Sequence, residues 1–122
     1  METIDKFKVA FSEKNNWEIL SKVHHEILSL GADISFLIYP IYIKYFQGDK
    51  VIAVVFFKSG GSHMDALEKD QIDLGLNIST KPKNIGFRSA EYMKDRNVSY
   101  SILLKNSDSL KTISGAIRLL AE

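Results

Sequence analysis

The sequence predicts an α+β fold, a two-layer sandwich in which a mostly antiparallel four-stranded sheet carries helices on one face, in the order α-β-β-β-α-β-α. Two segments, residues 16–30 and 110–120, repeat apolar residues at the spacing of an amphipathic helix. Residues 72–80 alternate apolar and polar side chains, as strands with one solvated face do. Three strand-like segments follow one another over short connections, which favours an antiparallel meander. With 122 residues, the chain is expected to form one domain.

The first helix is expected over residues 16–30. Asn15 followed by Glu18 forms a capping-box pattern at its start. His24 borders the apolar stripe and is expected to pack there, whereas His25 lies on the polar side. The stripe itself consists of Ile19, Leu20, Val23, Ile27 and Leu30.

Three strands are expected to follow this helix. Residues 36–46 are rich in aromatic and β-branched residues, although Pro40 indicates an edge strand or a bulge. Residues 51–57 are apolar on both faces, as in a central strand, and are expected to form a hairpin with the segment before them. The alternation in residues 72–80 places Asp73 among the side chains that face solvent or a partner. The side chains expected to face the helices are Ile72, Leu74, Leu76 and Ile78.

The C-terminal third is expected to contain a strand between two helices. Residues 81–87 have the composition of a basic loop, and residues 89–96 are expected to form a short helix capped by Ser89. Residues 98–104 are expected to be the fourth strand. An Asn-Ser-Asp-Ser run precedes the final helix, residues 110–120, and can cap it.

Composition excludes several classes of site. The net charge is +1 with acids and bases interspersed, so bulk charge gives no reason to expect nucleic acid or an anionic membrane as partner. The chain has no cysteine, which excludes disulfides, thiol nucleophiles and zinc-thiolate sites. No apolar run reaches the ~18 residues that span a bilayer, and the N-terminus lacks the features of a signal peptide. We therefore expect a cytoplasmic protein that does not enter a membrane.

No residue pattern indicates catalysis or metal binding. His24 and His25 are neighbours on a helix and point about 100° apart, so they do not chelate one ion comfortably. His63 lies beside Ser62 on a glycine-rich loop, whereas catalytic triads assemble residues that are distant in sequence on a rigid scaffold. We expect no catalytic residue, no metal ligand and no cofactor.

Two candidate binding sites remain. The first is a basic segment with one aromatic residue, where free amides at a helix start would favour a phosphate or another anion. Its residues are Lys81, Lys83, Arg88 and Tyr92. As loop charges, the basic side chains should contribute little to stability. The second candidate is a small-molecule pocket lined by Tyr42 and Tyr45, with core packing as the alternative explanation for both tyrosines.

Several segments together resemble a known family. They are Trp17 to Ile34, Tyr42-Ile43-Lys44-Tyr45, Asp73-Leu74-Gly75-Leu76-Asn77 and Ser101-Ile102-Leu103-Leu104 with the helix after it. The chain is similar to small uncharacterised bacterial and archaeal domains labelled "predicted transport protein", which are related to YdhG-like domains. The resemblance implies an α-β-β-β-α-β-α layer, often found beside nuclease-like domains, with no established chemistry. The chain departs from this family in a longer segment at residues 58–71 and in lacking a tryptophan-glycine pair before the last strand.

These observations favour a non-catalytic binding or protein-interaction module, possibly accessory to an enzyme. The alternative is a nucleic-acid-associated accessory domain that works with a nuclease and binds phosphate through the basic loop. The partner is expected to be a protein or a small ligand, and a homodimer is left open.

Overall fold

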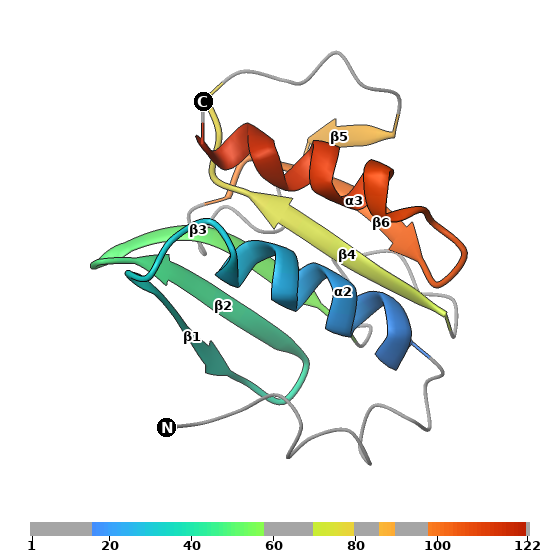
Figure 1. Ribbon diagram of the computed structural model, residues 1–122, viewed down its shortest axis with the longest axis horizontal. Helices are drawn as coiled ribbons and strands as arrows, with labels where there is room; N and C mark the ends of the chain where they lie inside the picture. Colours follow the sequence, from blue (N-terminus) through green and yellow to red (C-terminus); the bar gives the residue numbers. More distant parts are fainter. Residues whose placement is uncertain (1–15, 58–69, 80–85, 90–97, 122) are drawn as a thin grey trace.

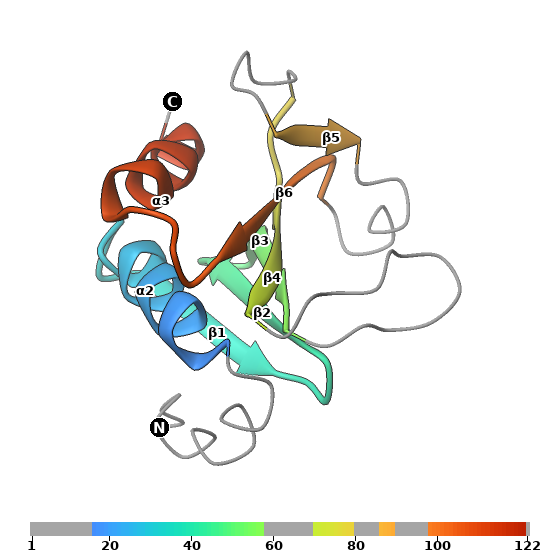
Figure 2. The same cartoon turned by 90° about the vertical axis from the view of Figure 1, so that its right-hand side faces the viewer.

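The computed structural model describes residues 16–57, 70–79, 86–89 and 98–121. Within these residues the chain forms one antiparallel sheet with both helices on the same face (Figures 1 and 2). The strands are β1 (Ile34–Ile38), β2 (Tyr42–Gln47), β3 (Lys50–Phe56), β4 (Gln71–Leu76), β5 (Phe87–Ser89) and β6 (Tyr100–Lys105). The helices are α2 (Trp17–Leu28), α3 (Leu110–Ile117) and the short 3-10 helix η3 (Arg118–Ala121). The strand order across the sheet is β1-β2-β3-β4-β6-β5.

The predicted four-stranded sheet and its element order are wrong, because the sheet has six strands. The segment read as one strand, residues 36–46, is a hairpin: β1 and β2 pair with each other, and Pro40 lies in the turn between them. Proline suits this turn because it cannot donate to a ladder. The second additional strand is β5, which pairs with β6 at the opposite edge. Ser89 is therefore the last residue of a strand, and the helix expected over residues 89–96 otherwise lies outside the described residues.

The start of α2 is held by side chains from distant parts of the chain. Asn16, not Asn15, occupies the N-cap position, and its side-chain Nδ2 donates to the carbonyl oxygens of Phe57 and Gln71 at 3.0 Å each. The cap itself comes from Asn106, whose Oδ1 accepts from the backbone N–H of Ile19 at 3.1 Å across 87 residues of sequence. This bond ties the helix to the loop after β6. Asn15, with which the predicted capping box begins, lies outside the described residues.

The second helix follows its predicted pattern. The Oγ of Ser109 accepts from the backbone N–H of Thr112 at 3.2 Å, which caps α3 as expected. A hydrogen bond of 3.0 Å from Ser114 Oγ to Glu26 Oε2 links α3 to α2, so the two helices form one layer. Neither helix among the described residues is long and apolar enough to cross a bilayer.

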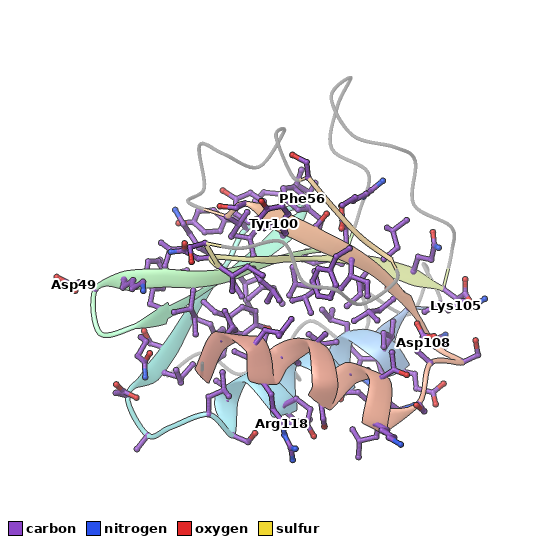
Figure 3. The ribbon with its side chains drawn as sticks, turned by 90° about the horizontal axis from the view of Figure 1, so that it is seen from above. Asp49, Phe56, Tyr100, Lys105, Asp108 and Arg118 are labelled. Carbon is purple, nitrogen blue, oxygen red and sulfur yellow. The ribbon has the colours of Figure 1, made fainter. Side chains whose placement is uncertain are left out.

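Strand pairing sorts the side chains into two faces. The row that faces the helices is buried in the main core and consists of Ile43, Val55, Leu74, Ile102 and Phe87. The matching row on the outer face consists of Leu37, Lys44, Val54, Gly75, Ser101 and Arg88. A second buried cluster on the outer face contains Val51, Val54, Phe56 and Val98. Figure 3 shows Phe56 on the side of the sheet away from the helices. Burial on both faces makes the middle of the sheet a rigid support.

Candidate functional site

The structure describes one residue of the predicted basic site. Lys81, Lys83 and Tyr92 lie outside the described residues, while Arg88 lies in the middle of β5. Its Nη2 donates to Asp73 Oδ2 at 3.1 Å, and the Asp73 side chain is fully buried while that of Arg88 is 32% exposed. Arg88 is therefore part of the sheet, and its charge is paired with a carboxylate of the protein.

The path of the Arg88 side chain depends on two small residues. In the outer-face row, Arg88 lies opposite Ser101, which lies opposite Gly75 on β4. Asp73 is two residues from Gly75 on the same strand and therefore on the same face. Serine and glycine have small side chains, which is compatible with a guanidinium that reaches across β6 to the carboxylate on β4.

This ion pair corrects two expectations. The alternation in β4 is as predicted for Ile72, Leu74 and Leu76, which are fully buried in the main core. Asp73, however, is also fully buried instead of solvated. Arg88 is likewise not a loop cation of little structural consequence, because removing it would leave a buried carboxylate without its ion pair.

Tyr42 and Tyr45 do not share a pocket. They lie on opposite faces of β2: Tyr45 is fully buried in the main core, and Tyr42 packs against the outer cluster. The ring of Tyr42 stacks on that of Tyr39, with centroids 4.6 Å apart and planes at 18°, and also meets Phe56 at 5.1 Å. Odd and even positions on a strand point to opposite faces, so the sequence spacing already separates the two tyrosines.

Tyr45 instead pairs with His24. The phenol oxygen lies 2.8 Å from His24 Nδ1, and the Phe36 ring meets the imidazole edge-on at 4.7 Å. His24 is 3% exposed, in agreement with its predicted packing role. Burial raises the pKa of the Tyr45 phenol far above its ordinary value of 10.0. Burial in the core therefore favours the neutral form of this phenol.

The described residues do not assemble a metal-binding cluster. Within residues 16–57, 70–79, 86–89 and 98–121, no three His, Asp or Glu side chains gather as a metal site would require. His25 is exposed on α2, and His63 lies outside these ranges.

The outer side of β1 is an open sheet edge within the described part of the chain. Tyr39 N–H donates to Tyr42 O at 2.8 Å and Gly48 N–H donates to Asp33 O at 3.3 Å, so residues at odd positions carry the bonds to β2. Because backbone groups alternate in direction along a strand, those of Ile34, Phe36 and Ile38 point away from β2. Among the described residues, no strand pairs with this side, and Figure 1 shows β1 as the outermost strand.

The side chains of β1 complete this surface. Ser35 and Leu37 are exposed on the outer face, and Leu37 is 49% exposed. Ile34, Phe36 and Ile38 are only partly buried at the margin of the main core. We name the outward backbone groups of these three residues, together with the side chains of Ser35 and Leu37, the β1 edge. All five residues of β1 are uncharged, so the β1 edge combines hydrogen-bonding backbone groups with uncharged side chains.

Sequence reasoning missed the β1 edge because it placed residues 36–46 in a single strand. The available signal was Pro40 shortly after the five uncharged residues Ile34 to Ile38, since proline is common in turns. Comparisons of this chain with family models, curated proteins and solved structures found no match. The predicted family resemblance therefore stays a prediction, and the functional argument rests on geometry.

Proposed function

We propose that this chain is a non-catalytic protein-interaction module that binds a strand of its partner along the β1 edge. The observation that carries the proposal is the outward direction of the Ile34, Phe36 and Ile38 backbone groups on a sheet edge with an exposed leucine beside them. An extended segment that adds to such an edge gains main-chain hydrogen bonds along its length.

The composition of β1 supports this proposal. Natural proteins protect exposed edge strands with lysine, proline, bulges or inward-pointing charges, because an open edge pairs readily with other chains. β1 carries none of these, since its sequence is Ile-Ser-Phe-Leu-Ile and its pairing with β2 has no bulge. An edge that is open among the described residues, on a sheet buried on both faces behind it, supports a role in strand binding. The lack of cysteine is compatible with a module that works in the cytoplasm.

The alternative, a phosphate-binding domain that works with a nuclease, has weaker support. Arg88 was one of its three cations, and its pairing with Asp73 at 3.1 Å weighs against a role as phosphate ligand. The alternative then rests on Lys81 and Lys83. Retention on a polyanion column at low salt, lost in the K81A/K83A variant, would favour it, because phosphate contacts release counterions and weaken steeply with salt.

Site-specific photo-crosslinking in cells tests the proposed function. A benzophenone amino acid replaces Leu37 in the full chain, and the matched control carries it at Leu110 on α3, which is 54% exposed compared with 49% for Leu37. We expect covalent protein adducts from position 37 and not from position 110. Absence of adducts at 37, or equal adducts at both positions, would overturn the proposal.

A further inference from the structure

We propose that the strand which pairs with the β1 edge is β1 of a second copy of this chain, antiparallel and related by a two-fold axis at Phe36. The inference rests on the proposed function, because it takes the β1 edge as the binding surface and names its occupant. Its basis is that β1 is self-complementary in backbone hydrogen bonding, in side-chain size and in charge.

The backbone pattern is the first argument. A two-fold axis at Phe36 places Phe36 opposite Phe36 of the second copy, and Ile34 opposite Ile38. These are the residues whose backbone groups point outward, so each of these pairs falls at a hydrogen-bonded position of the new ladder. The Phe36 N–H then donates to the Phe36 carbonyl of the other copy, and the Ile38 N–H to the Ile34 carbonyl. The Ile34 N–H already donates to Gly31 O at 3.4 Å, so it is satisfied without the second copy.

The side chains are the second argument. The same axis places Leu37 opposite Ser35 of the other copy on the outer face, at a non-hydrogen-bonded pair where side chains are closest. The two-fold axis repeats this pair, so each copy's large Leu37 side chain lies opposite the small Ser35 side chain of the other copy. On the inner face, the partly buried Ile34, Phe36 and Ile38 of both copies become adjacent. Their remaining exposed apolar surface leaves water, and the helices of both copies cover the same side of the joined sheet.

Charge and size are the third argument. Like charges directly opposite each other destabilise a strand pair, and the five residues of β1 carry no charge to oppose. Pairing also removes the open edge of both copies at once. A contact of one short strand is small beside the ~1,600 Å² of a standard interface, so the dimer should dissociate on dilution.

Sedimentation velocity over a dilution series tests the association. We expect wild type to approach twice the 13.8 kDa of one chain at high concentration and to dissociate on dilution. Two variants test the register: S35K/L37K places like charges opposite each other across the axis, and S35E/L37K places opposite charges there. We expect the first to be monomeric and the second to dimerise at least as strongly as wild type. The L110K variant, changed at an exposed leucine on α3, should behave as wild type.

Engineered cysteines test the same register directly, because the chain has none of its own. The Cα atoms of a non-hydrogen-bonded antiparallel pair lie ~4.5 Å apart, which a disulfide can bridge. We expect an equimolar mixture of S35C and L37C chains to form the mixed disulfide in preference to either homodisulfide. Circular dichroism confirms that each variant is folded.

The outcomes separate this inference from the proposed function. A monomeric wild type at the highest concentration, an S35K/L37K variant that dimerises like wild type, or a random distribution of disulfides would overturn the second copy as occupant. If adducts at position 37 then contain a different protein, the module still binds through the β1 edge. If position 37 yields no adduct at all, the proposed function fails as well.

Discussion

Removal of the Arg88 guanidinium should destabilise the protein far more than removal of an exposed arginine. Arg88→Ala leaves the Asp73 carboxylate, which is fully buried, without the cation now 3.1 Å away. Breaking a buried ion pair by removing one partner costs ~3–5 kcal/mol. Because the Arg88 side chain is 32% exposed, we expect the low end, about 3 kcal/mol. For a chain of this size, that loss lowers the melting temperature by roughly 10 °C.

A double-mutant cycle measures this loss with its own control. Urea unfolding compares wild type, R88A, D73N and R88A/D73N, and R118A serves as the exposed-arginine control. The double variant should be more stable than R88A alone, because the amide of Asn costs less to bury than a carboxylate that has lost its ion pair with Arg88. Equal stability of R88A and R118A, or of R88A and the double variant, would show that the ion pair does not hold β5 to the sheet.

Two further stability measurements test the packing of α2 and its distant cap. Ile27→Ala should lower the free energy of unfolding in urea melts by ~2–5 kcal/mol, because Ile27 is fully buried. His25→Ala, on the exposed side of α2, should change it by less than ~0.5 kcal/mol. Equal losses for the two variants would contradict the orientation of the helix. Asn106→Ala should cost ~1 kcal/mol of stability because it removes the acceptor for the Ile19 N–H. The control, Ser107→Ala at the exposed neighbouring position, should be nearly neutral. Similar effects of the two variants would argue against a cap by Asn106.

The helices were predictable because their signals are local. The buried side of α2 is the predicted stripe, and α3 begins at the predicted serine cap. The cap of α2 was not predictable, since Asn106 reaches Ile19 only after β6 has paired with β4 and brought the two segments together. Asn16 occupies the N-cap position, and its side chain bonds to the carbonyl oxygens of Phe57 and Gln71. Local propensity predicts an element, while tertiary contacts decide how its end is satisfied.

The sheet was harder to predict because its errors come from non-local pairing. Tyr39 and Ile41 beside Pro40 are strand-forming residues, so the turn between β1 and β2 lacks the usual glycine or asparagine signal. β5 has three residues, too few for a periodic pattern to appear. Asp73 is buried with its ion-pair partner Arg88, which lies on a different strand. The alternation of residues within β4 does not predict this partner.

The candidate binding residues were predictable by residue type, whereas the β1 edge was not. The exposed charge candidates were chosen by residue type, and pairing within the fold occupies one of them, Arg88. The β1 edge instead depends on which backbone groups point outward, and this follows from the register of β1 with β2. The direction of backbone groups cannot be inferred from residue types. A strand that binds through its main chain is therefore recognised only once the register of the sheet is known.

The buried pair of Tyr45 and His24 makes a prediction for alkaline pH. The Tyr45 phenol is fully buried, and burial raises its pKa above the ordinary 10.0. Above pH 10 the unfolded chain therefore releases a proton that the folded chain retains, so the stability contributed by this group is complete below pH 10 and falls as pH rises. Between pH 9 and pH 11 the loss from one such group is about 1.4 kcal/mol.

Tyr45→Phe isolates this term, because every other titrating group is the same in both proteins. At pH 8 the variant should be less stable by ~1–2 kcal/mol, since His24 Nδ1 loses its 2.8 Å bond to the phenol. That deficit should shrink steadily above pH 10 and nearly vanish by pH 11, as wild type loses its own advantage. Urea melts at each pH measure the difference. A deficit that stays constant from pH 8 to pH 11 would mean that the Tyr45 phenol ionises as readily in the folded chain as in the unfolded one, and that the contact with His24 does not exclude water.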